Sequence, residues 1–275
     1  MKFRLLAILI GSALSGSAHA AGSDSLNPML DDKFTFRLGA TWLKADGDFS
    51  STRNGEPTDK LSTSDLGVDD TETNAAFSAR WRFTERWRLS FDYFGLDIDG
   101  NVREDFDILD FGDIQASGFL AVDTKFDTDF YITQVGYSLL KNERAELGIG
   151  GGMHLVRFDT KLKVSGGIND KSGSVQSDSV DLTAPLPNLL GFGTYAFTPK
   201  LALEGGVGWF GLDYNDYSGN LTSAFANLEY RMTDHFGVGI GYNYIHMDLA
   251  IDKSKRTDKY NIDYKGPVAY VSASF

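Results

Sequence analysis

Ionisable side chains alternate with apolar and aromatic ones in several segments of the chain. Arg80 and Arg82, for example, are flanked by Ala79, Trp81 and Phe83. Rings of charge set the selectivity of channels, but charges of opposite sign also pair and fill a narrow interior. Because the two signs nearly balance, we expect a paired structural network rather than a selectivity filter. Its predicted members are Arg37, Arg80, Arg82, Arg88, Asp92, Glu146, Glu204, Glu229, Arg231, Asp263 and Lys265.

Extended segments with a period of two are the elements that must hold these side chains on one face. In residues 33–44, large apolar residues at even positions alternate with Thr35, Arg37 and Thr41. Large aromatics on one face and polar groups on the other are what lipid outside and a polar lumen inside require. The sequence therefore predicts an all-β fold, a transmembrane antiparallel up-and-down β-barrel. The predicted strands are 33–44, 74–84, 87–97, 126–140, 145–157, 187–197, 200–212, 221–232, 235–248 and 259–275.

The strand count depends on how the weaker segments are assigned. Ten is the expected number from the ranges above. It is an even count, which places both termini on the periplasmic side of the membrane. Eight strands result if two weak runs are loop hairpins. Twelve result if residues 105–122 add another membrane-spanning pair.

Short and long connections alternate strictly between these strands. The short ones, each predicted to be a tight turn, are 84–86, 141–144, 198–200 and 233–235. The long polar ones are 45–73, 98–125, 158–186, 213–220 and 249–258. Outer-membrane barrels have short periplasmic turns and long extracellular loops, so the alternation indicates the orientation as well as the fold.

The two ends of the chain carry export and assembly signals. Residues 1–20 combine a basic start, an apolar stretch and Ala18-His19-Ala20, which predicts a cleaved signal peptide. Residues 21–32 would form an N-terminal periplasmic segment, and 33–275 the barrel. The last strand ends on Val271, Ala273 and Phe275, which resembles the C-terminal signature of Gram-negative outer-membrane proteins. This resemblance implies location in the outer membrane, and the barrel assembly machinery and periplasmic chaperones as partners during biogenesis.

Two histidines remain candidates for chemistry in the predicted strands, His154 and His246. His246 and Asp248 share one strand face two residues apart, a spacing similar to that of the His and Asp in omptin proteases, which are ten-stranded outer-membrane barrels. That resemblance implies a protease site with an acidic pair across the rim. Here the order is reversed, and His246 is in phase with the outward Tyr242 and Tyr244. We expect a polar rim at the membrane interface instead.

Apolar residues of the last strand change phase along its length. They occupy even positions up to Tyr264 and odd positions from Ala269 onward, with Gly266-Pro267 between. Since proline cannot donate to a ladder, a β-bulge is predicted there.

Composition limits the partners. The formal net charge is −12, and removal of Lys2 and Arg4 with the signal peptide leaves 24 basic against 38 acidic residues, or −14. This balance argues against nucleic-acid binding. There is no cysteine, so no disulfide supports the fold. No motif for a cofactor or a metal is present in the sequence, and none is expected.

The sequence thus predicts a monomeric outer-membrane barrel in contact with lipid and lipopolysaccharide. We expect an envelope-structural or surface-interaction role, with a narrow channel at most because the lumen is charged and largely filled. The alternative is an outer-membrane barrel enzyme, either an omptin-like protease or a lipid A-modifying hydrolase or acyltransferase.

Overall fold

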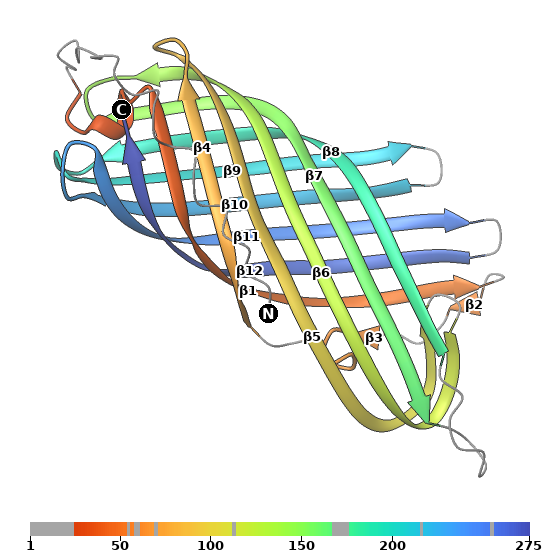
Figure 1. The fold of residues 1–275 in the computed structure, drawn as a ribbon. Coiled ribbons are helices and arrows are strands. Elements are labelled where there is room, and N and C mark those ends of the chain that lie inside the picture. The colour runs from red at the N-terminus through yellow and green to blue at the C-terminus, as the bar shows by residue number, and fades with distance from the viewer. Residues whose placement is uncertain are drawn as a thin grey trace, which may run out of the picture.

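The computed structural model describes residues 25–53, 56–57, 61–68, 71–111, 114–166, 176–214, 217–253 and 256–275, so the predicted signal peptide lies outside the described residues. Ten long antiparallel strands close into a barrel, because β1 pairs with both β4 and β12 (Figure 1). The predicted ten-stranded up-and-down barrel is therefore confirmed. The elements are η1 (Pro28–Leu30), β1 (Phe34–Arg53), β2 (Glu56–Pro57), β3 (Leu61–Ser62), β4 (Glu72–Arg82), β5 (Trp87–Phe111), β6 (Ile114–Lys141), β7 (Ala145–Gly166), β8 (Gln176–Ala196), β9 (Leu201–Tyr214), β10 (Tyr217–Arg231), β11 (Phe236–Lys253) and β12 (Arg256–Ser274).

Four tight turns join strands at one end of the barrel, here called the turn end. Each turn begins with a side-chain oxygen that accepts hydrogen bonds from the backbone amides two and three residues later. The acceptors are Thr84, Asn142, Thr198 and Thr233. This local chemistry favours turns over continued strand. Both ends of the barrel-forming chain meet at the turn end, where Phe34 and Phe275 exchange backbone hydrogen bonds of 2.9 Å.

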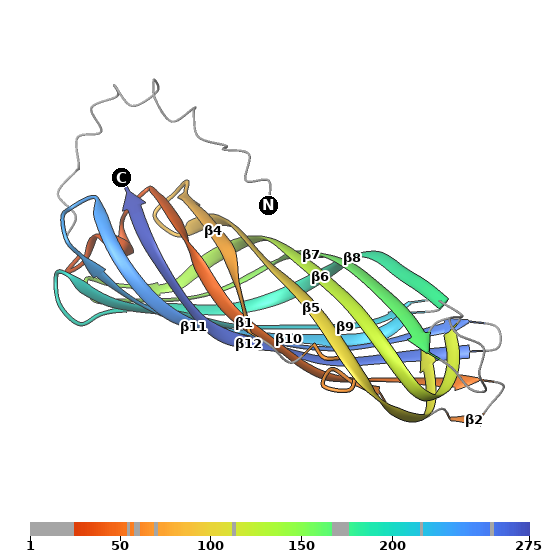
Figure 2. The same ribbon diagram turned by 60° about the horizontal axis from the view of Figure 1, so that its bottom comes forward.

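At the opposite end, here called the hairpin end, the strands continue far beyond their predicted limits. β5 has 25 residues and β6 has 28, so most of the predicted loop 98–125 is a long hairpin. Strands β5 to β8 lean away from β9 to β12 and β1, and the wall divides into two layers (Figures 1 and 2). The pairing of β8 with β9 ends at Leu189 and Trp209. Pro185 and Pro187 follow on this free edge, where proline blocks further strand pairing.

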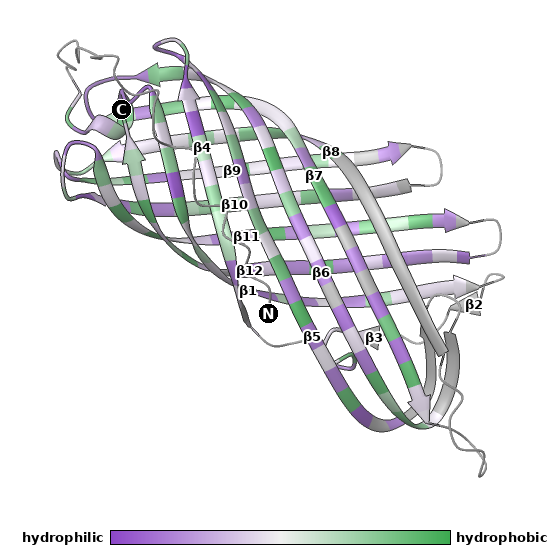
Figure 3. Cartoon of the chain, viewed as in Figure 1, coloured by the Kyte–Doolittle hydropathy of each residue, from purple (hydrophilic) through white to green (hydrophobic). Residues whose placement is uncertain are grey.

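Hydrophilic and hydrophobic residues alternate along strands such as β5, β6 and β7 (Figure 3), but the two faces of the wall exchange character along the barrel axis. Near the turn end the apolar side chains point outward, as for Leu38 and Ile240, which are 62% and 64% exposed. Near the hairpin end the apolar side chains point inward. Tyr264 is 1% exposed, whereas its neighbour Lys265 lies on the outer face.

This exchange explains the phase change of the last strand without a bulge. Pairing of β11 with β12 runs without a shift through Tyr242–Pro267, Asn243–Gly266 and Tyr244–Lys265. The predicted β-bulge is therefore wrong. The strand keeps its register along its whole length. Near the turn end its apolar residues are those that face outward, and near the hairpin end they are those that face the apolar core.

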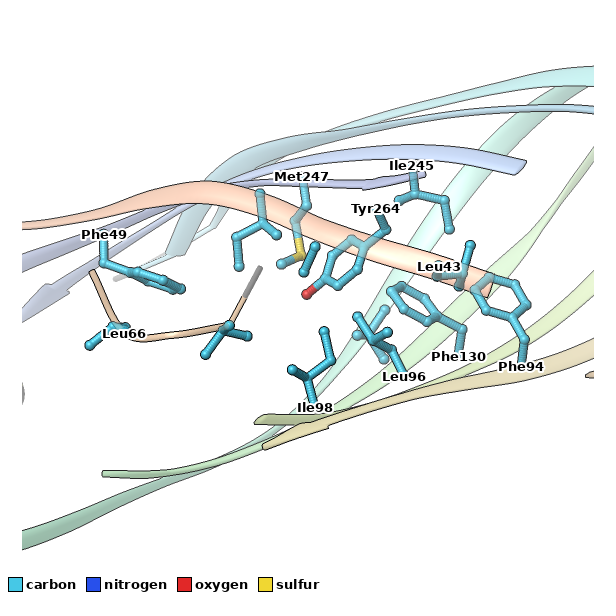
Figure 4. Close-up of a cluster of buried hydrophobic side chains, with 14 of the residues drawn as sticks. Leu43, Phe49, Leu66, Phe94, Leu96, Ile98, Phe130, Ile245, Met247 and Tyr264 are labelled. Atoms are coloured by element: carbon cyan, nitrogen blue, oxygen red, sulfur yellow. The ribbon is translucent and has the colours of Figure 1, made fainter. Parts of the chain in front are cut away.

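The interior of the hairpin end is an apolar cluster between the two layers (Figure 4). Phe94, Leu96 and Phe130 come from one layer, and Ile245 and Tyr264 from the other. The connection after β1 folds back into the same space. It buries Leu66 and Val68, at 2% and 1% exposure, on either side of Gly67, whose φ of +67° favours glycine.

No helix within the described ranges is long and apolar enough to cross a membrane.

Candidate functional site

A network of arginines and carboxylates fills the lumen in the half nearest the turn end. Glu204 of β9 is its centre, with its oxygens 2.7 Å from Arg37, 2.5 Å from Arg80 and 3.5 Å from Arg88. These three arginines come from β1, β4 and β5, on the far side of the barrel in strand order. The contacts therefore span the lumen and occupy the space that a pore would need.

A second pair lies closer to the turn end. Arg82 of β4 donates two hydrogen bonds to Glu146 of β7, at 2.8 and 2.7 Å. The Ser138 hydroxyl also donates to Glu146, which is 0% exposed. This two-point geometry is the strong form of an Arg–carboxylate contact.

A third group joins the N-terminal segment to the last strands. Arg231 of β10 contacts Asp32, Glu229 and Ser274, with its Nε 3.3 Å from Glu229. Glu229 also accepts a hydrogen bond of 2.8 Å from Ser272 of β12. Parity along the last strand would have placed both serines inward, but no sequence signal placed Asp32 beside Arg231.

The N-terminal segment closes the lumen at the turn end. Met29 and Leu30 of η1 are both 0% exposed. Asn27 accepts a hydrogen bond of 3.0 Å from the Met29 amide and donates one of 3.2 Å to the Thr198 carbonyl. Asp31 lies 2.9 Å from Lys141. The predicted periplasmic segment is thus held against the barrel wall as a cap.

Glycines of β6 and β7 make room for an aromatic ring inside this network. A side chain at Gly136 or Gly148 would overlap the Phe192 ring. The Arg88 guanidinium stacks on that ring, 3.4 Å from its centroid, a favourable cation–π contact. Gly136 and Gly148 therefore leave room for the Phe192 ring, and the Arg88 guanidinium packs against the face of that ring.

A cavity of about 160 Å³ lies in the lumen between the charge network and the apolar cluster. Arg37, Arg80, Arg88 and Glu204 line it, and so does the predicted network member Asp92. Among the described residues, the charged groups of the whole turn-end half of the lumen, including those that do not line the cavity, are five arginines and five carboxylates, so their charges balance. They are Arg37, Arg80, Arg82, Arg88 and Arg231, with Asp32, Asp92, Glu146, Glu204 and Glu229.

Two predicted lumen residues lie on the outer face instead. Lys265 is 3.3 Å from Asp46, and Asp263 is 2.7 Å from the Nδ1 of His246. Both belong to the part of β12 beyond the exchange of faces, where odd positions point outward. Placing them in the lumen assumed that the apolar residues of this segment face lipid, whereas they face the core.

His246 and Asp248 point outward together, as the phase of the strand predicts. The His246 Nε2 lies 3.0 Å from Asp248, and Tyr244 donates a hydrogen bond of 3.0 Å to Asp263. The imidazole therefore sits between two carboxylates on the outer surface. Its hydrogen bond to Asp263, and then that to Asp248, raise the pKa of His246.

The described part of the chain contains no group of three or more His, Cys, Asp or Glu side chains arranged to hold a metal ion. His154 is the one other histidine placed inside a described strand, and it is buried in the lumen beside Asn188.

No protein-family model matches this sequence, and no curated protein does. Among solved structures, the fold is similar to the outer membrane protease OmpT from Escherichia coli. The TM-score is 0.65 at 13% identity, over 89% of this chain and 97% of the other. The Pseudomonas putida toluene transporter TodX gives a TM-score of 0.33 at 9% identity, over 92% and 93%. A Pseudomonas aeruginosa FadL homologue gives 0.35 at 10%, over 91% and 92%.

Identities this low concern the fold and carry no activity across. The likeness to OmpT agrees with the closed ten-stranded wall and with the apolar outer face near the turn end. The chain has the fold of a Gram-negative outer-membrane β-barrel protein.

Proposed function

We propose that this protein is a monomeric, non-conducting outer-membrane β-barrel with a structural or surface-interaction role in the cell envelope, and that it is not an enzyme. The observation that carries the proposal is the closure of the lumen at three successive levels. These are the cap formed by Met29 and Leu30, the network around Glu204, and the apolar cluster with Leu66 and Val68.

The charge network supports a structural role because each part connects distant strands. Breaking one buried ion pair leaves a charge without a partner, which is strongly destabilising. A path for ions would have to break several pairs at once. The network therefore suits a rigid wall better than a gate.

The hairpin end supports a surface-interaction role. It would face the extracellular side, because short turns are periplasmic in outer-membrane barrels and the predicted signal peptide would deliver the chain from that side. Its apolar core between two strand layers resembles the inside of a soluble β-sandwich. Such a core would stiffen the projecting parts of the strands that surround it.

A row of lysines supports contact with lipopolysaccharide. Lys44 of β1 pairs directly with Lys265 of β12, which in turn pairs with Tyr244 of β11. Tyr244 lies at the end of the apolar outer band that begins at Phe236. Lys44 places a cation at that height for the phosphates of outer-leaflet lipid, whereas Lys265 also contacts Asp46, at 3.3 Å.

The position of His246 weighs against an enzyme. His246 and Asp248 face outward. The two ring nitrogens of His246 contact Asp248 and Asp263. A hydrolytic site of the omptin kind would need an acidic pair facing them across the rim. The outward orientation turns both side chains away from any such position.

A deletion strain complemented with variants tests the proposed role. Replacement of 105–117, the tip of the β5–β6 hairpin, by a short turn keeps the buried Leu120 and Val122. We expect this variant to insert and fold normally yet to fail in restoring the envelope or surface phenotype of the deletion strain. Normal restoration by the trimmed variant would show that the projecting hairpin does not carry the function.

A further inference from the structure

The cavity in the middle of the lumen contains a histidine with an unsatisfied ring nitrogen. His154 of β7 lines the cavity and is 1% exposed. Its Nε2 lies 3.3 Å from the side-chain nitrogen Nδ2 of Asn188, while its Nδ1 has no hydrogen-bond partner among the described residues. A buried polar atom without a partner costs free energy unless something inside the cavity satisfies it.

The surroundings of the cavity are polar on one side and apolar on the other. Toward the turn end it meets Arg37, Arg80 and Asp92, and toward the hairpin end it meets Phe94, Ile132 and Ile245. A molecule that fills this space would place an apolar body against the second wall. Its polar group would then lie beside His154, which pairs directly with Ile132 of that wall.

The size of the cavity limits the occupant to a small molecule. Its volume is about 160 Å³, and an apolar cavity of about 150 Å³ is enough to bind benzene. A single aromatic ring with one polar substituent fits this space. A lipid chain or a peptide does not.

Charge balance and hydrogen bonding define the chemistry further. The three arginines that line the cavity are matched in number by Glu204, Asp92 and Glu229, which Arg37 also contacts, and Arg231 beside Glu229 is matched by Asp32. No net charge is left for an ion to neutralise, so a charged ligand would lose its hydration without a counter-charge. The Asn188 side-chain nitrogen can only donate, so the Nε2 of His154 accepts and the free Nδ1 carries the proton. A hydroxyl oxygen can accept that hydrogen bond, and its own proton can be donated to the Oδ1 of Asn188, which also has no partner among the described residues.

The wall offers an approach to this site. Asn188 is the residue directly beyond Leu189, where the pairing of β8 with β9 ends. Beyond this point the two strands are not joined by a ladder, and Pro187 removes a backbone donor. Local separation of β8 from β9 therefore breaks no ladder hydrogen bond beside His154.

We propose that the lumen cavity beside His154 binds a small neutral molecule that combines a single apolar ring with a hydroxyl group. The hydroxyl pairs with the free ring nitrogen of His154, and the ring packs against Phe94, Ile132 and Ile245. This inference is independent of the proposed surface role, because it concerns the interior alone.

Binding of 4-fluorophenol, followed by ¹⁹F NMR on the full-length protein in lipid nanodiscs, tests the proposal. Fluorobenzene is the comparison probe, since it keeps the ring and lacks the hydroxyl. Empty nanodiscs measure partition into lipid. The wild type should show a saturable shift with 4-fluorophenol, with at least roughly tenfold tighter binding than fluorobenzene, as expected for one satisfied buried hydrogen bond.

Three variants separate the site from the lipid. Ser223→Leu fills the cavity from β10, and Thr222→Leu makes the same addition on the outer face of that strand. His154→Phe removes the ring nitrogens and keeps a ring. We expect Thr222→Leu to bind like the wild type and Ser223→Leu to lose saturable binding of both probes. His154→Phe should lose the preference for 4-fluorophenol over fluorobenzene.

Several results would overturn the proposal. They are a wild-type signal equal to that of empty nanodiscs, unchanged binding in Ser223→Leu, or a structure of the soaked protein in which only ordered water contacts His154. Heat-dependent gel mobility verifies that each variant is folded. If His154→Phe does not fold, the pair Ser223→Leu and Thr222→Leu still decides the outcome.

Discussion

Arg82 and Glu146 face each other from β4 and β7 and are joined by two hydrogen bonds across the lumen, at 2.8 and 2.7 Å. Neither side chain is more than 4% exposed. The pair ties together strands that are separated by β5 and β6 in the barrel order. Replacement of these two residues is therefore the most direct test of whether the network stabilises the barrel wall.

Loss of one partner of this pair should destabilise the barrel more than loss of both. We expect Arg82→Met to lower the free energy of unfolding by about 3–5 kcal/mol, because Glu146 is left as a buried charge without its partner. The double variant Arg82→Met with Glu146→Gln should recover part of that loss. Urea unfolding in lipid vesicles, read as a double-mutant cycle, measures the coupling. Additive effects would show that the two side chains are energetically independent.

Alanine at Gly148 should be far more costly than alanine at Gly151 of the same strand. A side chain at Gly148 would overlap the Phe192 ring and the Tyr137 carbonyl oxygen, whereas at Gly151 the nearest atom is 3.4 Å away. Overpacking of this kind costs about 1–3 kcal/mol, and we expect a change below about 0.5 kcal/mol for Gly151→Ala. The unfolding midpoints of the two variants provide the comparison. Equal midpoints would mean that the Phe192 ring moves aside freely.

The contribution of His246 to stability should fall as the pH rises. Hydrogen bonds to Asp263 and then Asp248 raise the pKa of His246 above its usual value. The stabilisation is therefore fully present below the unfolded pKa, about 6.5, and is lost as the pH rises through the raised folded pKa. The gap in unfolding midpoint between the wild type and His246→Gln should narrow from pH 5.5 toward pH 9. A gap independent of pH would contradict the ion-paired geometry.

Removal of Phe275 should impair assembly in the outer membrane. The Phe275 backbone pairs with Phe34 and its carbonyl also accepts from Lys33, so the last residue closes the barrel. Its ring stacks on His235 at a centroid distance of 5.3 Å. We expect the deletion to lower outer-membrane levels severalfold and Phe275→Tyr to preserve them, as measured in membrane fractions. Normal levels of the deletion variant would argue against an assembly signal at this end.

Parity along the strands predicted the membrane half of the barrel well and the hairpin end poorly. Near the turn end, large residues such as Leu38 and Ile240 face lipid, and period two identifies both faces. At the hairpin end the same alternation surrounds an apolar core, so Tyr264 faces inward and Lys265 outward. The pattern alone cannot tell which face meets lipid.

Closure of the lumen depends on contacts that are distant in sequence. Asp32 precedes the first strand and contacts Arg231 only because the N-terminal segment folds against the turn end of the barrel. Leu66 lies in a polar connection, and its burial in the apolar cluster of the hairpin end follows from the fold of that segment. Phe192 was hidden in a strand without clear alternation. None of these positions carries a local sequence signal for its partner.

The current through single wild-type barrels in a planar lipid bilayer tests the central claim, a lumen closed by its own side chains. With the cap, the Glu204 network and the apolar cluster in place, inserted protein should pass no more current than the bare membrane, with insertion verified by protease protection. Stable open-channel currents from the wild type would contradict the closed lumen.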